Sequence, residues 1–224
     1  MIQWCPETEG ILYGSGNPPG APYRSGDRPE LEAIARRQGW LERPLRARPE
    51  AIARFVADLA PHSTLPLDQL RFGGTEEEIV ARGSDWCPDV ARVACAFAQV
   101  VGLPARLVIL VDPSRAYSGH TIVEVWSEDR WGAVDAVRGR VHRTDEGAPA
   151  SAADLAARPE LRPGTPGMPE EGAAWVAIAD YPLGPVESAD YSVGRINDYY
   201  RTILSMSERG WPGGMRWLFG EDDR

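Results

Sequence analysis

The feature that most constrains this chain is the stretch of residues 87–101, which is apolar or small almost throughout. It begins Cys87-Pro88, and its polar residues, Asp89, Arg92 and Gln99, fall on one narrow stripe at helical spacing, which the small Ala96 continues. Proline is tolerated in the first turn of a helix, so the pattern predicts a helix that begins at Cys87. A helix with so narrow a polar stripe must be buried over most of its circumference. The rest of the chain therefore has to supply the elements that surround it.

The residues after this helix predict a small antiparallel sheet. Gly102-Leu103-Pro104 ends the helix, and strands are expected over 106–111, 121–126 and 131–136. The last two form a hairpin through a four-residue turn, Ser127-Glu-Asp-Arg130. A helix followed by strands in this order indicates an α+β fold, with the Cys87 helix packed on the sheet.

Further helices are expected on both sides of this centre, together with two loop-rich segments. Helical spacing and end signals predict helices between Pro29 and Gly39, between Pro49 and Pro61, from Thr75 to Gly83, around 151–158 and over 190–206. Residues 1–30 are rich in Gly and Pro, residues 145–172 are rich in Ala, Pro and Glu, and residues 175–179 form a possible extra strand. We expect an N-terminal extension over 1–82, a core over 83–140 and a third part over 141–224, packed as one domain.

Composition limits the classes of partner. The 224 residues include 24 arginines, no lysine and 33 acidic residues, which gives a net charge of −9. No basic block suits a nucleic acid, and no apolar run approaches the roughly 18 residues that span a membrane. The start of the chain lacks the pattern of a secretory signal, and three cysteines are too few for a disulfide framework. We therefore expect a soluble cytoplasmic protein that binds neither nucleic acid nor membrane, with a net charge that favours neutral or cationic substrates.

Cys87 is the candidate nucleophile. The N-terminus of a helix places free N–H groups and partial positive charge near the sulfur, which favours the thiolate. The Cys87 backbone N–H is also a natural donor to an oxyanion. The alternative is a small buried hydrophobe, the commoner fate of a free cysteine. Cys95, two turns further along, fits that alternative well, and Cys5 has no visible role.

The hairpin brings a histidine and an aspartate together. If Trp126 pairs with Trp131, then Ile122 lies opposite Asp135 and His120 is its diagonal neighbour on the same face of the sheet. An imidazole held by a carboxylate and offered a thiol is the arrangement that cysteine catalysis requires. The alternative, should this register not hold, is a surface histidine and a turn aspartate. His62 and His142 lack such partners and are expected to be surface residues.

These elements in this order resemble the transglutaminase-like superfamily, whose architecture is related to that of papain-like cysteine proteases. The resemblance rests on Cys87 at a helix start, the run 102–106 (Gly-Leu-Pro-Ala-Arg), the run 120–125 (His-Thr-Ile-Val-Glu-Val) and the run 131–135 (Trp-Gly-Ala-Val-Asp). It covers about residues 83–140. It implies Cys87 as nucleophile, His120 as general base and then acid, and Asp135 as the residue that orients His120. Arg106 would be structural, supporting a turn or an ion pair.

The resemblance has departures and leaves one role open. Members of the superfamily often carry glycine two residues before the cysteine and an aromatic residue soon after the histidine, whereas this chain has Asp85 and Thr121-Ile122. Trp86 would lie at the rim of the pocket, as a platform for substrate or as packing. A second oxyanion donor is not identified by the sequence, and Gln69 and Trp86 are the candidates.

The reaction expected from the resemblance is acyl transfer through a thioester. An amide or ester of a small molecule or peptide would be the substrate, and water or an amine would be the acceptor. No metal or organic cofactor is expected. Two alternatives stay open: a cysteine peptidase of the same fold that cuts a specific peptide, and an inactive binding module that has lost the chemistry.

Overall fold

A computed structural model describes Tyr13 and residues 23–59, 75–84, 86–112, 117–161 and 176–179. The predicted helix over 190–206 lies outside these ranges. So do Cys5, His62, Gln69, most of residues 1–30 and the latter part of the 145–172 segment.

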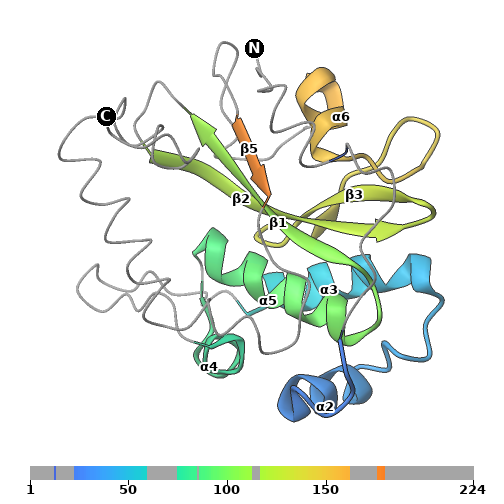
Figure 1. Cartoon of the computed structure of the whole chain (residues 1–224), viewed down its shortest axis with the longest axis vertical. Helices are drawn as coiled ribbons and strands as arrows, with labels where there is room; N and C mark the ends of the chain where they lie inside the picture. Colours follow the sequence, from blue (N-terminus) through green and yellow to red (C-terminus); the bar gives the residue numbers. More distant parts are fainter. Residues whose placement is uncertain are drawn as a thin grey trace.

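The core of the fold is a five-stranded antiparallel sheet in the order β4-β3-β2-β1-β5 (Figure 1). Its strands are β1 (Ala105–Asp112), β2 (Tyr117–Ser127), β3 (Arg130–Asp135), β4 (Arg140–Val141) and β5 (Val176–Ala179). The three strands predicted after the Cys87 helix are all present, and β5 corresponds to the possible strand over 175–179. The α+β fold expected from the sequence is therefore confirmed.

The β2–β3 hairpin has the predicted register but a tighter turn. Trp126 pairs with Trp131, and their rings meet edge to face with centroids 5.5 Å apart. Ser127 pairs with Arg130, so the turn consists of Glu128 and Asp129 alone, with φ of 55° and 58°. Positive φ at both residues is the signature of a type I′ turn, whose twist matches that of the strands it joins. The predicted four-residue turn is therefore wrong. Ser127 and Arg130 pair as the last residues of the two strands, which leaves a turn of two residues.

The predicted buried helix is α5 (Cys87–Val100). Every residue from Pro88 to Val100 is buried. Phe97 packs edge to face against Trp40 and Phe55, with ring centroids 5.0 and 5.6 Å apart. Val123, Val125 and Val134 of the sheet belong to the same apolar cluster. The core thus lies between α5 and one face of the sheet.

Even the polar stripe of α5 is buried, because charged partners cover it. Asp89 pairs with Arg82 at 2.9 Å, and Arg92 pairs with Glu76 at 2.6 Å. Both partners belong to α4 (Glu76–Arg82), which starts at a capping box between Thr75 and Glu78. Buried charges are tolerated only when they are paired, so α4 has to pack on this stripe.

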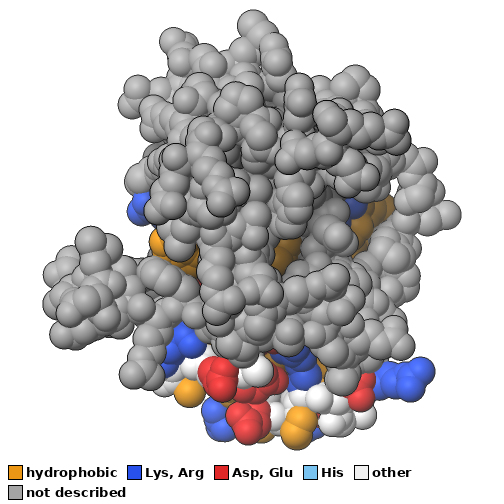
Figure 2. Space-filling model, turned by 60° about the vertical axis from the view of Figure 1, so that its left-hand side comes forward, with side chains coloured by type: hydrophobic (Ala, Val, Ile, Leu, Met, Phe, Trp, Pro, Cys, Tyr) orange, Lys and Arg blue, Asp and Glu red, His pale blue; other side chains and the backbone are white. Residues whose placement is uncertain are grey.

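The remaining helices lie on both sides of the sheet. Helices α2 (Pro29–Arg37), α3 (Arg48–Ala57) and α4 lie with α5 on one side, and α6 (Ala152–Ala157) lies on the other (Figure 1). Short 3₁₀ turns, η1 (Leu45–Ala47) and η3 (Pro159–Leu161), precede α3 and follow α6. Acidic and basic side chains gather at the end of the molecule formed by α2 and α4 (Figure 2). None of the helices in the described ranges is long and apolar enough to cross a lipid bilayer.

Candidate active site

Cys87 is the first residue of α5, as the sequence predicted. Trp86 precedes it in extended conformation (φ −82°, ψ 119°), and Pro88 occupies the first turn. The Cys87 side chain is half-buried. Its sulfur therefore lies at the positive end of the helix dipole, where an anion is stabilised.

His120 lies on β2 next to a β-bulge. Leu110 of β1 pairs with His120, and the next residue, Val111, pairs with Ser118, so Gly119 is an extra residue in β2. A bulge bends its strand and re-aims the neighbouring side chains, and such bulges are frequent beside active sites. The His120 side chain is buried, with 7% of its surface exposed.

His120 and Asp135 meet across the hairpin. Val123 of β2 pairs with Val134 of β3. Continuing this register by one residue places Ile122 opposite Asp135 and makes His120 the diagonal neighbour of Asp135. His120 Nε2 lies 3.3 Å from Asp135 Oδ2. This is ion-pair distance with imperfect hydrogen-bond alignment, and neither atom has another hydrogen-bond partner within the described ranges. Asp135 Oδ1 accepts a hydrogen bond from the backbone N–H of Arg138 at 3.2 Å.

The titration of these groups follows from their contacts. Burial opposes the charged imidazolium, but interactions with Asp135 and Cys87 outweigh it and raise the pKa of His120 to about 9. Burial likewise opposes the charged Asp135 carboxylate, but His120 outweighs it and holds the pKa of Asp135 below its usual range. Since Nε2 faces Asp135, Nδ1 is the ring nitrogen left for Cys87. The site can therefore hold an imidazolium beside the Asp135 carboxylate, with Cys87 as its other neighbour.

Further along β2 from His120, Arg106 of β1 forms a buried ion pair with Glu124. Its Nε lies 2.8 Å from Glu124 Oε2, and its guanidinium lies 4.0 Å from the centre of the Trp131 ring. Glu124 also accepts hydrogen bonds from the Tyr13 hydroxyl and the Ala152 N–H at 2.6 and 2.7 Å. The expected structural ion pair of Arg106 is thus present. The sequence did not identify Glu124 or Tyr13 as its partners.

The prediction for His142 is wrong. It is 2% exposed rather than a surface residue, because it continues the β3–β4 pairing and its N–H donates to the Ala133 carbonyl at 2.9 Å. Its Nδ1 lies 3.1 Å from the Leu161 carbonyl oxygen in η3, so η3 covers it. The neighbouring arginines, Arg140 and Arg143, suggested that His142 is exposed. The alternation of side chains along a strand was the signal that could have predicted its burial.

The other candidates divide as follows. Trp86 precedes Cys87 and is 37% exposed. Its place at the rim of a pocket stays a prediction. Cys95 is fully buried, and burial raises the pKa of its thiol, as expected for a packing cysteine. Gln69 lies outside the described residues. Within those residues, no group of three or more His, Cys, Asp or Glu side chains is arranged to hold a metal ion.

Comparison with known proteins agrees with the resemblance seen in the sequence. Residues 32–136 match the model of the transglutaminase-like superfamily. This part of the chain is therefore similar to the core of that superfamily.

Among solved structures, Legionella pneumophila LapG is 15% identical, over 88% of this chain and 96% of LapG, with a TM-score of 0.45. EGTA-treated Legionella pneumophila LapG is 16% identical, over 63% of this chain and 75% of LapG, with a TM-score of 0.40. No match was found among curated proteins.

Proposed function

We propose that this protein is an acyl-transfer enzyme in which Cys87 is the nucleophile, His120 the general base and acid, and Asp135 the residue that orients His120. The observation that carries the proposal is the interaction of His120 with both other members: Nε2 lies 3.3 Å from Asp135 Oδ2, and Cys87 contributes to the raised pKa of His120. A thiolate and an imidazolium held together in this way are the reactive form of a cysteine enzyme.

In the first step, the Cys87 thiolate attacks the carbonyl carbon of an amide or ester, and a tetrahedral oxyanion forms. The Cys87 backbone N–H is the first candidate donor to that oxyanion, with Trp86 and Gln69 as candidates for the second. His120 then donates its proton to the leaving amine or alcohol as the bond to carbon breaks. The product of this step is a thioester on Cys87.

In the second step, neutral His120 takes a proton from water or from an amine, which attacks the thioester. Water yields a carboxylic acid, and an amine yields a new amide; in both cases the Cys87 sulfur leaves as thiolate. The same three residues serve both acceptors. A peptidase that cuts one specific peptide would differ from this proposal only in its substrate.

The proposal is tested first by thiol labelling at mildly acidic pH. We expect iodoacetamide to modify Cys87 there, because a helix N-terminus and a neighbouring imidazolium both favour the thiolate, which is the reactive form. The Cys95→Ala variant should label as the natural chain does, and Cys87→Ala should not label. The His120→Asn variant retains the thiol but should lose its reactivity at acidic pH. Equal labelling of Cys87 with and without His120 would refute the proposed pairing.

A second measurement separates the reactions. Mass spectrometry of a panel of peptide amides and esters, incubated with and without a small primary amine, should reveal an acid in the absence of amine and an amide if transfer occurs. An inactive binding module would bind such compounds but form neither the acid nor the amide. In that case the Cys87→Ala variant would bind them as the natural chain does.

A further inference from the structure

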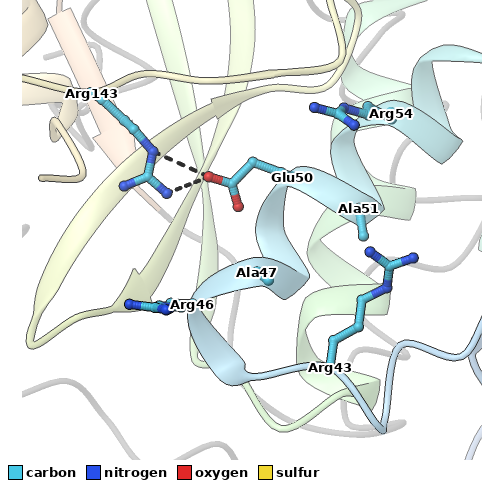
Figure 3. A pocket seen from close by; sticks show the side chains of 7 residues that line it. All are labelled: Arg43, Arg46, Ala47, Glu50, Ala51, Arg54 and Arg143. Atoms are coloured by element: carbon cyan, nitrogen blue, oxygen red, sulfur yellow. Dashed lines mark hydrogen bonds and ion pairs between the residues drawn. The ribbon is translucent and has the colours of Figure 1, made fainter. Parts of the chain in front are cut away.

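A hollow of about 350 Å³ lies over the beginning of α3, among elements that do not carry the Cys87 site. Its lining consists of four arginines, one glutamate and two alanines: Arg43, Arg46, Ala47, Glu50, Ala51, Arg54 and Arg143 (Figure 3). The alanines are short and leave the space that the longer charged side chains surround. The volume falls in the range of about 300–1,000 Å³ that is usual for ligand sites.

Of the four arginines in the lining, only Arg143 has a side-chain partner among the residues that the structure describes. Arg143 hydrogen-bonds Glu50 through Nε at 3.2 Å and through a second nitrogen, and it also donates to the Gly147 carbonyl. In the described part of the chain, the exposed guanidinium groups of Arg43, Arg46 and Arg54 make no hydrogen bond or ion pair. Four arginines against one glutamate leave the lining with a net charge of +3, on a chain whose own net charge is −9.

The arrangement of these groups favours an extended ligand over a single small anion. In Figure 3, Arg46 lies on one side of Glu50 and Ala47, whereas Arg43 and Arg54 lie on the other side, around Ala51. The three guanidinium groups do not converge on one point. A single phosphate ion could not contact them all, but a chain that carries several carboxylates could.

Glu50 does not compete with a ligand for these three arginines. Its Oε1 accepts a hydrogen bond from Arg143. Its Oε2 is buried, so a ligand in the hollow does not reach it. The hollow therefore presents separated guanidinium groups whose charge only Arg143 shares with a carboxylate. A chain that carries several carboxylates, as an acidic peptide does, complements this charge.

We propose that this hollow is a docking site for an acidic peptide segment. Guanidinium groups bind carboxylates by paired, charge-assisted hydrogen bonds, which fits Arg43, Arg46 and Arg54 as the anchoring residues. The site does not involve Cys87 or its partners, so the proposal stands whether or not the acyl-transfer reaction is confirmed.

The test is fluorescence anisotropy with a labelled Glu-Gly repeat peptide and a Gln-Gly repeat of the same length. We expect only the Glu-Gly peptide to bind, with an affinity that falls as salt increases. The double variant Arg46→Gln with Arg54→Gln should raise Kd about tenfold, at about threefold for each exposed charge pair. The Cys87→Ala variant should bind as the natural chain does.

The matched control is Arg24→Gln with Arg37→Gln. Both residues are exposed, both lie outside the hollow, and the net charge changes by the same amount. Binding by this control should equal that of the natural chain, with circular dichroism verifying that both double variants are folded. Equal weakening in the two double variants would show attraction by overall charge and overturn the proposal. Tripolyphosphate that binds through Arg46 and Arg54 while the Glu-Gly peptide does not would overturn the choice of ligand.

Discussion

The Nε2 atom of His120 lies 3.3 Å from Oδ2 of Asp135, and the two residues reach each other as diagonal neighbours on adjacent strands of a hairpin. Because the Trp126–Trp131 pair and the two-residue turn fix the register of this hairpin, they also fix the distance between the imidazole and the carboxylate. A slip of one residue would move Asp135 to the opposite face of the sheet.

The Asp135→Asn variant tests what the negative charge of Asp135 contributes to catalysis and to the pKa of His120. The amide keeps the size of the carboxylate but not its negative charge, so we expect kcat/KM to fall by about a hundredfold or more. The pKa of His120 should fall from about 9 toward its ordinary value, because the Asp135 interaction is the largest of the contributions that raise it. NMR titration of His120 measures this shift directly. An unchanged titration would mean that Asp135 does not hold the imidazolium.

The stability of the protein should fall as the pH rises from neutral to alkaline values. The pKa of His120 is raised in the folded state, from 6.5 to about 9. Its contribution to the free energy of unfolding is therefore complete below about pH 6.5 and disappears as the pH passes through about 9. Urea unfolding of the natural chain and of His120→Gln across this interval should give curves that converge as the pH rises. Parallel curves would contradict the assigned shift.

The Arg106–Glu124 pair should behave as a buried ion pair. Arg106→Met leaves the Glu124 carboxylate buried without its guanidinium, and we expect a loss of about 3 kcal/mol in the free energy of unfolding. Arg106→Met combined with Glu124→Gln should cost less than the sum of the two single changes, because it leaves no uncompensated charge. A double-variant cycle in urea measures the difference. Strict additivity would show that the two side chains do not interact.

Gly132 should not tolerate a side chain. A Cβ at this position of β3 would lie 2.6 Å from the Cβ of Pro149, so Gly132→Ala must displace the segment that leads to α6. Overpacking of this kind costs about 1–3 kcal/mol. Gly102→Ala is the comparison: its Cβ would meet nothing within 4 Å, but its φ of +82° still strains an alanine. Thermal unfolding should show the larger loss for Gly132→Ala, and equal losses would show that Pro149 yields freely.

Much of the framework could be read from local patterns. The proline after Cys87 and the apolar run behind it gave the start of α5, and the two tryptophans gave the register of the hairpin. These signals involve residues close together in the chain, where periodicity and turn chemistry act directly. The order of Cys87, His120 and Asp135 along the chain was therefore recognisable, and so was the transglutaminase-like core that carries them.

The tertiary structure alone decided which polar residues are buried. The sequence by itself determined that α5 would be enclosed, but its stripe of Asp89 and Arg92 is buried only because Arg82 and Glu76 of α4 neutralise it. Likewise, Tyr13 reaches Glu124 across 111 positions of sequence. A local pattern records the polarity of a residue but not its partner, and the partner determines whether a charge can leave water. For that reason the candidate nucleophile, Cys87, could be identified in the sequence, whereas the buried Arg106–Glu124 ion pair required the fold.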